Sequence, residues 1–254
     1  MINLNSDNSL TNFGFKLVQA TQKNLLVKEV FSSVSQNYDL MNDLMSLGIH
    51  RIWKKTMLDM LGVGNGSLID VASGTGDIAA MYMKNYIQNY NVTPEITITD
   101  YNENMLEVSK KKHNWHKYPQ VKVIAADAAN LPMNDMSFDN YSIAFGLRNM
   151  TDIQQVLKEA NRVLRPAGKI VILEFSKVLY PLLERFYDSY SFTVIPFLGE
   201  MVAKNREAYQ YLVESIRKFP DQDTLAFMMR EEGFTNVEYR NLSGGIAAIH
   251  FGWK

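Results

Sequence analysis

Ser67-Leu68-Ile69-Asp70-Val71-Ala72-Ser73-Gly74-Thr75-Gly76-Asp77 is the stretch that decides the fold of this chain. Its apolar first half runs into small residues and two glycines, and apolar side chains then recur at helical spacing up to Ile87. This order predicts a strand, a tight turn and a helix. Glycines allow backbone N–H groups to approach a bound molecule closely, and a helix N-terminus favours negative charge. The turn is therefore either a binding site for an anionic or nucleotide-like group or a plain connection between strand and helix.

Acidic residues end the next two predicted strands. Residues 95–100 are predicted as a strand that ends at Asp100, and residues 121–126 as a strand followed by Asp127-Ala128. A nucleotide-binding α/β unit places an acid roughly 20 residues beyond its glycines, where the acid accepts hydrogen bonds from ribose hydroxyls. The carboxyl ends of parallel strands face one ligand crevice, so the turn and these acids are expected to share it.

Strands and helices alternate along most of the chain. Residues 138–145 and 169–175 are predicted strands, and residues 153–164 between them form a helix with a clear apolar face. Alternation of this kind predicts a parallel sheet with helices on both faces. The segments 237–242 and 246–253 are expected to add an antiparallel C-terminal hairpin at the edge. The predicted fold is therefore α/β, with a seven-stranded, mostly parallel sheet.

Two segments outside this alternation are predicted to be helical. Residues 16–60 and 180–218 are rich in methionine and aromatic side chains and lack a clean strand pattern. Packing on the core explains such segments, and so does a lid that lines an apolar pocket. The domain division predicted here is a flexible tail at 1–15 and a single domain at 16–254. Within that domain, residues 16–60 form an N-terminal helical lid and residues 180–218 a helical cap insertion.

Composition excludes several classes of site. The 254 residues carry a formal net charge of −1, which gives no global electrostatic basis for binding nucleic acid. The absence of cysteine removes disulfides, thiolate metal ligands and cysteine nucleophiles, and the four histidines lack metal-ligand spacing, so no metal is expected. No segment approaches the roughly 20 apolar residues of a membrane span, and the polar start carries no sign of a secretory signal.

Several motifs resemble those of a known family. Residues 70–77 resemble the first motif of class I S-adenosylmethionine-dependent methyltransferases, and residues 164–169 resemble a helix-to-strand loop typical of their Rossmann-like fold. Closer matches, from about Val30 to Trp253, resemble the ubiquinone/menaquinone biosynthesis C-methyltransferases. These matches are residues 30–34, 38–43, 48–54, 144–149, 173–177, 187–192, 211–216 and 219–222. The Phe-Gly-Leu-Arg-Asn and Tyr-x-x-Tyr-Ser-Phe segments among them are specific to the family rather than to the fold.

The resemblance implies a cofactor and a reaction. Members transfer a methyl group from S-adenosylmethionine to a ring carbon of a polyprenylated benzoquinol or demethylnaphthoquinol, in ubiquinone or menaquinone biosynthesis. The donor's methionyl carboxylate, ribose and adenine have separate contacts in the family. The positions implied here are Thr75 for the carboxylate, Asp100 for the ribose, Asp127 and Ala128 for the adenine, and Asp70, Gly74 and Gly76 in the turn around them.

Two residues depart from the pattern. Ala72 stands where many methyltransferases carry the first glycine of the turn, as it does in much of this family. Ala144 stands where many members have a serine that contacts the cofactor. That contact is therefore not carried over to this chain.

The reaction itself indicates which catalytic groups to expect. C-methylation needs an electron-rich carbon in line with the sulfonium methyl group, at roughly 3–3.5 Å. A quinol becomes such a nucleophile when it loses a phenolic proton, so the site must assist deprotonation and stabilise the oxyanion. Arg148 is predicted to stabilise the oxyanion, directly or through a water that takes the proton, with a surface salt bridge as the alternative. Asn149, Tyr38 and His50 are secondary candidates for orienting the ring, with core packing as the alternative for each.

Other functions and partners stay open at this point. The same fold could methylate a sterol or another small molecule, or serve as a cofactor-binding scaffold in a quinone-synthesis complex. A nicotinamide-binding enzyme is disfavoured because the third glycine of its phosphate fingerprint is missing after Gly76. The apolar tail of a polyprenylated quinol predicts peripheral, reversible membrane association at the inner face of the membrane, in the cytoplasm. A quinone-biosynthesis complex and a homodimer are the partners that the resemblance implies.

Overall fold

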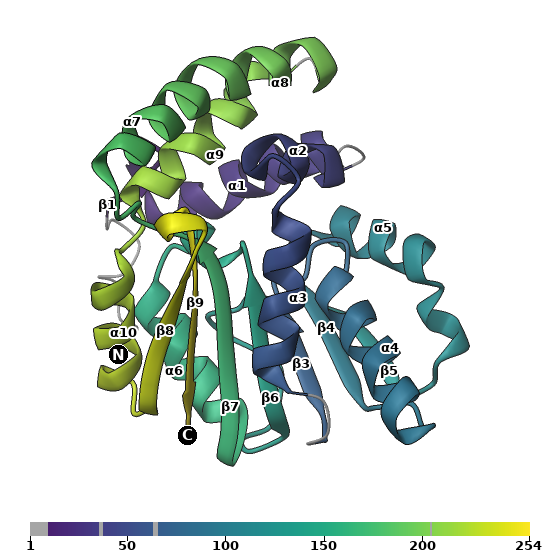
Figure 1. Cartoon of the computed structure of the whole chain (residues 1–254). Coiled ribbons are helices and arrows are strands. Elements are labelled where there is room, and N and C mark those ends of the chain that lie inside the picture. Colours follow the sequence, from purple (N-terminus) through teal and green to yellow (C-terminus); the bar gives the residue numbers. More distant parts are fainter. Residues whose placement is uncertain (1–9, 36–37, 63–65, 204) are drawn as a thin grey trace, which may run out of the picture.

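A seven-stranded sheet forms the centre of the molecule (Figure 1). The computed structural model describes residues 10–35, 38–62, 66–203 and 205–254. The strand order is β5-β4-β3-β6-β7-β9-β8, and the first five of these strands run parallel. The strands are β3 (Leu68–Val71), β4 (Ile96–Asp100), β5 (Val121–Ala125), β6 (Phe138–Ala144), β7 (Leu164–Phe175), β8 (Thr235–Leu242) and β9 (Ala247–Trp253). The predicted α/β fold with a mostly parallel sheet is confirmed.

The antiparallel C-terminal hairpin predicted at the edge of the sheet is confirmed, with its two strands in reversed order. β9 pairs antiparallel with both β7 and β8, so it lies inside the sheet and not at its edge. The edge strand β8 therefore runs in the same direction as the five parallel strands. Burial explains the order, because β9 is buried along most of its length whereas β8 alternates between buried and exposed positions. A strand with one solvated face belongs at an edge or on an open face.

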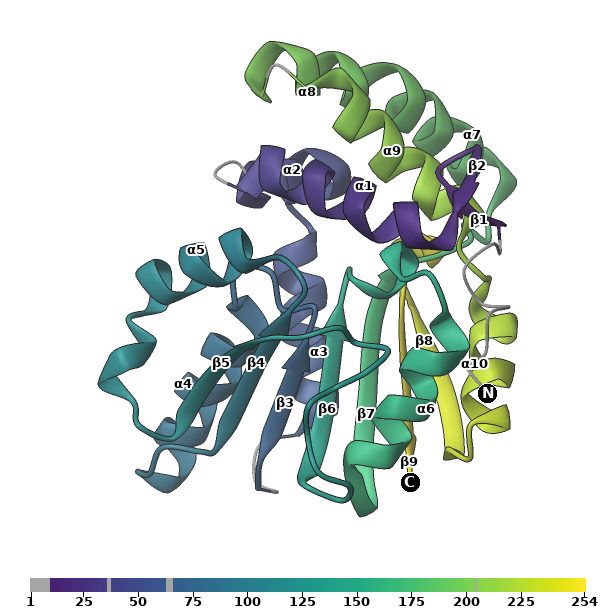
Figure 2. The ribbon, with the colours of Figure 1, turned by 180° about the vertical axis from the view of Figure 1, so that it is seen from behind.

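Helices cover both faces of the sheet (Figure 2). Those on one face are α3 (His50–Leu61), α4 (Asp77–Tyr90) and α5 (Glu103–His113), and those on the other are α6 (Ile153–Val163) and α10 (Gln222–Glu231). Each set buries its apolar side chains against the sheet, which produces two separate cores. β3 is buried along its whole length between these cores, as expected for a continuous apolar strand in a parallel sheet.

The strand order reverses between β3 and β6. In open α/β sheets, ligands bind beyond the carboxyl ends of the strands at this reversal. The glycine-rich turn at residues 72–76 follows β3, and the short helix η3 (Leu147–Asn149) follows β6. The two strongest sequence motifs therefore flank one crevice.

A further layer of helices covers the carboxyl ends of the parallel strands (Figures 1 and 2). α8 packs on α9 and α2, and α1 packs on α9. The helices α1 and α2 of the predicted lid therefore form one layer with the predicted cap, although the two segments lie far apart in the sequence, whereas the last part of the predicted lid is α3, on a face of the sheet. Its members are α1 (Ala20–Val34), α2 (Tyr38–Ser46), α7 (Pro181–Ser189), the π-helical turn η4 (Tyr190–Val194), α8 (Ile195–Ala203) and α9 (Arg206–Lys218).

The predicted boundary of the N-terminal tail is wrong. β1 (Leu10–Phe13) and β2 (Lys16–Gln19) form an antiparallel hairpin, so the lid segment also begins as a strand and not as a helix. Phe13 stacks on Tyr211 of α9 with ring centroids 4.1 Å apart, and the amide of Phe15 donates a hydrogen bond to Glu214 Oε2 at 2.9 Å. These partners are about 200 positions away in the sequence, which is why the local pattern gave no sign of them. The rest of the predicted tail, residues 1–9, lies outside the described residues.

Candidate active site

The turn after β3 brings its backbone close to neighbouring elements. Ala72 adopts a left-handed conformation, with φ of 49°, although it carries a side chain. Gly76 has φ of 79°, and a β-carbon there would lie 2.3 Å from Ser109 Oγ, so only glycine fits. The amide of Gly74 donates a hydrogen bond to Asp100 Oδ2 at 2.8 Å, which joins the turn to the end of β4.

Asp100 is the centre of the predicted ribose site. Its Oδ1 accepts a hydrogen bond from the Asn102 amide at 2.8 Å, while Oδ2 is bonded to the Gly74 amide. Burial raises the pKa of Asp100, and the two amide donors act in the opposite direction. The carboxylate is thus fixed in one orientation, and each oxygen retains a lone pair for hydroxyl donors.

A cavity lies at these strand ends. α1 closes it with Val27, Lys28 and Phe31. Asn102 ties that helix to the end of β4, because its Nδ2 donates to the carbonyl oxygen of Lys28 at 3.1 Å and to Ser32 Oγ at 3.0 Å. The predicted site residues that line this cavity are Gly74, Asp100, Asp127, Ala128 and Asn149.

Two other predicted cofactor residues lie on the other side of the turn. Asp70 and Thr75 line a separate, smaller cavity, and Gly76 lines neither cavity. Asp70 Oδ1 accepts a hydrogen bond from Ser142 Oγ at 2.6 Å, whereas Oδ2 has no hydrogen-bond partner among the described residues. Burial raises the pKa of Asp70 to about 7. Ala72 lines both cavities, so the turn separates them.

Arg148 lies in a buried ion pair. Its Nη1 donates to Glu174 Oε1 at 2.8 Å and to the carbonyl oxygen of Phe145 at 2.7 Å, and its side chain is 1% exposed. The alternative of a surface salt bridge is therefore wrong, and Arg148 does not line the larger cavity. Its Nε has no hydrogen-bond partner among the described residues. Burial raises the pKa of Glu174, and the Arg148 charge acts in the opposite direction.

Asn149 connects the cavity to the helical layer. Its Oδ1 accepts a hydrogen bond from the Tyr211 hydroxyl on α9 at 3.1 Å, and both residues are buried. Burial raises the pKa of Tyr211, so this hydroxyl keeps its proton and acts as the donor. The backbone of Tyr38 begins α2, but its side chain lies outside the described residues.

His50 lies at the start of α3 and lines neither cavity. Its Nδ1 lies 3.0 Å from Ser46 Oγ of α2, and the ring is buried. Burial, together with the nearby Lys54 charge, lowers the pKa of His50 to about 4. The imidazole is therefore neutral near pH 7 and links the two helices.

A family model described as the ubiE/COQ5 methyltransferase family matches residues 17–254. The chain belongs to this family. The ubiquinone/menaquinone biosynthesis C-methyltransferase UbiE of Rickettsia prowazekii is 50% identical over 245 residues, which cover 96% of this chain and 98% of that protein. The UbiE of Paracoccus denitrificans is 50% identical over 246 residues, which cover 96% of each chain.

Solved methyltransferase structures share the fold of this family member. A protein from Thermotoga maritima, described as a possible histamine N-methyltransferase, aligns with a TM-score of 0.62 at 19% identity and covers 89% of this chain and 99% of its own. A methyltransferase from Aquifex aeolicus aligns with a TM-score of 0.60 at 14% identity, covering 87% and 97%. At these identities the likeness shows the Rossmann-like fold alone.

Some residues around the crevice of this methyltransferase were not predicted. Glu174 lies within the family match at residues 173–177, and an acid within the apolar run of β7 indicates that it needs a buried partner. Asn102 could have been recognised as a helix N-cap, but its bonds to α1 depend on how that helix crosses the sheet. Tyr211 gave no local signal, because its partner Asn149 lies 62 positions away.

Proposed function

We propose that this methyltransferase transfers a methyl group from S-adenosylmethionine to a ring carbon of a polyprenylated quinol. The products belong to ubiquinone biosynthesis, menaquinone biosynthesis or both. The observation that carries this conclusion is the identity of 50% with curated UbiE proteins over 96% of the chain. The crevice at the strand reversal supplies the matching site.

The residues present fit the methyl donor. The larger cavity offers Asp100 as an acceptor for ribose hydroxyls, and Asp127 and Ala128 at the end of β5 for the adenine. Asp70 Oδ2, buried and without a partner among the described residues, is an acceptor on the far side of the turn. When bound, S-adenosylmethionine supplies an electrophilic methyl group. The chain's own task is to orient the acceptor carbon towards it and to exclude water.

Arg148 is the residue proposed to stabilise the acceptor oxyanion. A buried N–H without a partner is unfavourable, and the Nε of Arg148 is such a group among the described residues. A phenolate oxygen would satisfy it with a charge-assisted hydrogen bond. Because arginine keeps its proton, the phenolic proton must leave to a water molecule. Glu174 holds the guanidinium in place through two hydrogen bonds from Arg148, one from the backbone amide and one from Nη1.

Asn149 is proposed to orient the ring. It lines the larger cavity, and its side-chain oxygen is held by the Tyr211 hydroxyl. With Oδ1 occupied, the Nδ2 amino group is the part of the side chain left to donate to a quinol oxygen. Tyr38, on the neighbouring helix α2, remains a second proposed ring contact.

The test of this assignment compares Arg148→Ala with Arg148→Lys, which keeps a cation beside Glu174. Removal of one donor to a developing oxyanion lowers kcat by about 100-fold or more. We expect that loss in both variants on a short-chain quinol, with unchanged affinity for S-adenosylhomocysteine by calorimetry. Turnover near that of the wild type in a folded Arg148→Ala protein would remove Arg148 from the mechanism.

The acceptor is tested with the purified protein and three ring types. Methyl transfer is measured with a short-chain benzoquinol, a demethylnaphthoquinol and a sterol, each with S-adenosylmethionine. We expect product from at least one quinol and none from the sterol. Donor binding without transfer to any acceptor would favour the scaffold alternative.

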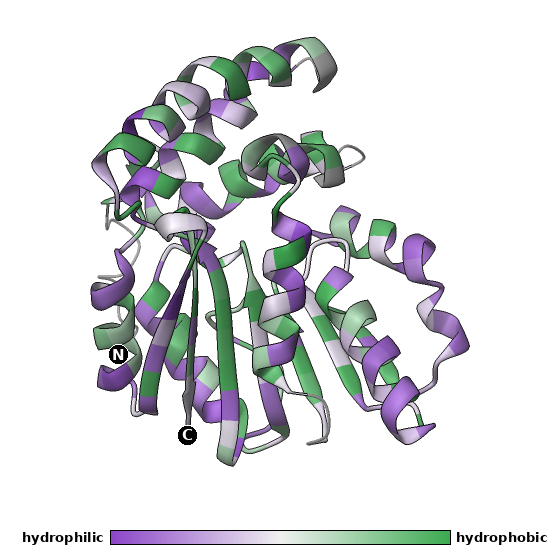
Figure 3. Cartoon of the chain, in the orientation of Figure 1, coloured by the Kyte–Doolittle hydropathy of each residue, from purple (hydrophilic) through white to green (hydrophobic). Residues whose placement is uncertain are grey.

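We further propose that the protein binds reversibly to the cytoplasmic face of a membrane. No helix in the described ranges is long and apolar enough to cross a membrane. Large apolar side chains on the outer cap are more than half exposed, namely Leu182 and Phe186 of α7 and Phe197 and Met201 of α8. Figure 3 shows apolar segments along both helices. This surface would rest on the lipid from which a polyprenyl tail enters.

Flotation with vesicles of phosphatidylethanolamine and phosphatidylglycerol tests the membrane proposal. We expect the wild type to float and the double variant F186E/F197E to remain with the soluble fraction. F227E is the matched control, because Phe227 is 59% exposed on α10, outside the cap. Absence of flotation both with and without quinol would refute the membrane proposal. If the wild type is a dimer and F186E/F197E is not, the surface would instead be assigned to contact with a second copy of the chain.

A further inference from the structure

A third cavity lies between the N-terminal hairpin, η3 and the C-terminal end of α9. Lys23 and Arg148 both line it, and neither of them lines the larger cavity that holds Asp100. Met150 lines both of these cavities, so the loop after η3 separates them. The third cavity thus gives Lys23 a common space with the guanidinium that is proposed to stabilise the oxyanion.

Lys23 stands in the first turn of α1 and is fixed on the loop after η3. Its Nζ donates a hydrogen bond to the carbonyl oxygen of Met150 at 2.8 Å, and the residue is 5% exposed. The next residue, Asn24, lines the larger cavity, and its Oδ1 accepts a hydrogen bond from Thr151 Oγ1 at 2.7 Å. Adjacent residues of α1 therefore face the two cavities, and both are tied to the loop between them.

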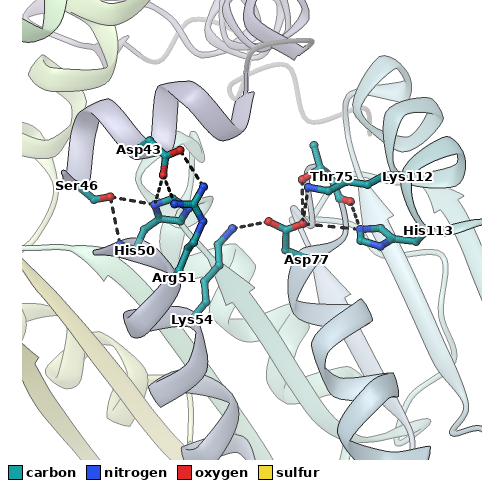
Figure 4. Close-up of polar contacts among 9 residues, drawn as sticks. All are labelled: Asp43, Ser46, His50, Arg51, Lys54, Thr75, Asp77, Lys112 and His113. Carbon is teal, nitrogen blue, oxygen red and sulfur yellow. Dashed lines mark hydrogen bonds and ion pairs between the residues drawn. The ribbon is translucent and has the colours of Figure 1, made fainter. Parts of the chain in front are cut away.

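Lys23 is a buried amine without a carboxylate partner among the described residues. Lys54, which is also buried, differs from it because its Nζ donates to Asp77 Oδ2 at 2.8 Å (Figure 4). Burial lowers the pKa of Lys23 to about 8. The helix dipole disfavours a cation in a first turn, and the first turn of α1 carries no acidic residue to offset this effect. A large fraction of the Lys23 amine is therefore neutral near pH 8, and a neutral amine accepts a proton.

Other charged or titratable groups face the third cavity from η3, α6 and α9. They are Arg148, Asp152, Tyr211 and Lys218. Arginine stays protonated, and burial raises the pKa of the Tyr211 hydroxyl, so both remain proton donors. Asp152 is the N-cap of α6, where its side chain accepts a hydrogen bond from the Gln155 amide at 2.9 Å. Lys218 is exposed, so water keeps its amine charged. Lys23 is thus the buried amine that is placed to exchange a proton in this cavity.

We propose that Lys23 is the proton acceptor of the methyl transfer and takes the phenolic proton of the quinol through a water molecule. The inference rests on the proposed function and adds to it the group that holds the proton. The phenolic O–H bond breaks, its electron pair stays on the oxygen beside Arg148, and the proton forms a new N–H bond on Lys23. Once the methylated ring carbon has released its own proton to water, the ammonium returns the first proton to the oxygen. Lys23 is then neutral again.

The pH dependence of the single-turnover rate tests this role. With a short-chain quinol, the wild-type rate should rise about 50-fold from pH 6 to pH 8 and then level off, because the neutral fraction of an amine with a pKa of about 8 does so. Lys23→Arg keeps the cation and the donor to Met150 but cannot accept a proton. Its rate at pH 8 should fall by about 100-fold or more, without the levelling near pH 8.

Two controls separate proton transfer from damage to the fold. Lys16→Arg changes an exposed lysine of β2 and should keep the wild-type profile. Calorimetry with S-adenosylhomocysteine should give the same affinity for Lys23→Arg and the wild type. A wild-type rate in Lys23→Arg would overturn the proposal, because that variant retains only the structural role. A wild-type rate that does not change between pH 6 and pH 8 would also overturn it.

Carbon-13 NMR of protein labelled at the lysine ε-carbons follows the same amine without turnover. The signal that disappears in Lys23→Arg should titrate in the wild type with a midpoint near pH 8. A midpoint at the ordinary ~10.4, with methyl transfer intact, would overturn the role of Lys23 and leave the proposed function standing. A wild type that transfers no methyl group to any quinol would instead refute the proposed function, whatever the midpoint.

Discussion

The two sides of the crevice are held together in different ways. On the side proposed to bind the methyl donor, here called the donor side, the contact between Gly74 and Asp100 joins residues 26 positions apart, and it comes from the Gly74 backbone amide. On the side proposed to bind the quinol, here called the acceptor side, Tyr211 reaches Asn149 across 62 positions, and Tyr187 reaches the carbonyl oxygen of Met45 across 142. The donor side is thus built from consecutive strand ends, whereas the acceptor side is built from helices that meet only in the folded chain. Mutations on the two sides should therefore have different effects.

The largest expected effect is on stability, at the buried ion pair of the acceptor side. Glu174→Gln leaves the Arg148 charge buried without a counter-charge, which should lower the free energy of unfolding by about 3 kcal/mol. Urea unfolding measures this change in the free energy of unfolding. The control Glu107→Gln removes an exposed partner of Lys110 and should leave stability nearly unchanged, because water screens exposed ion pairs. The double variant R148M/E174M should recover stability without recovering turnover, and recovery of both would remove the pair from the site.

The second effect is a pH dependence at the contact between α2 and α3. The pKa of His50 is lowered to about 4, below its usual ~6.5. Between these values the unfolded chain binds more protons than the folded chain, so stability falls as the pH drops from about 6.5 to about 4. His50→Gln should remove up to about 3 kcal/mol of that fall, measured by urea unfolding across this range. The exposed His116 provides the control, since His116→Gln should keep the wild-type slope. An equal slope in both variants would contradict the burial argument.

A smaller effect is expected on the donor side, and it should appear in binding. Asp100→Asn replaces a charged acceptor of ribose hydroxyls and disturbs the Gly74 contact, so donor affinity should fall by about 2 kcal/mol, or roughly 30-fold. Calorimetry with S-adenosylhomocysteine measures this change. The control Glu103→Gln, exposed in the first turn of α5, should bind normally. If Asp100→Asn instead lost affinity for the quinol and kept its affinity for S-adenosylhomocysteine, the assignment of the donor and acceptor sides would be reversed.

The smallest effect is expected from Tyr211→Phe. It removes the hydroxyl that holds Asn149 Oδ1, a neutral hydrogen bond that contributes about 1 kcal/mol. We expect kcat/KM for a short-chain quinol to fall by about fivefold, with donor affinity unchanged. The effect of Asn149→Ala should be smaller in the Tyr211→Phe background than in the wild type, because the two residues share one hydrogen bond. An equal fold-loss in both backgrounds would show that they act separately.

Local patterns were enough to predict most of the sheet and which residues stand at the carboxyl ends of its strands. The apolar run of β3, the glycines and the acids at the ends of β4 and β5 are each short signals, and the parallel fold brings their carboxyl ends together. Asp100, Asp127 and Ala128 accordingly line one cavity. The separation of Thr75 from them was not predictable, because it depends on how the turn at Ala72 divides the space.

For the acceptor side, the sequence predicted candidate residues but not how they are arranged in space. Arg148 stood out through its motif, yet nothing near it in sequence shows that Glu174 neutralises it. The N-terminal hairpin was missed for the same reason, since Phe13 and Phe15 find their partners on α9. Helical periodicity indicates which face is apolar but not which distant helix covers it.

The sequence by itself determined the strand–turn–helix unit at residues 68–87, the order of the acids and the family motifs. These depend on backbone propensity and on short spacings, which the chain carries locally. Tertiary structure alone decided that the turn separates two cavities, that Lys54 lies beside Asp70 in one of them, and that Arg148 is paired with Glu174. Such contacts arise only when buried charges from distant segments must find partners away from water.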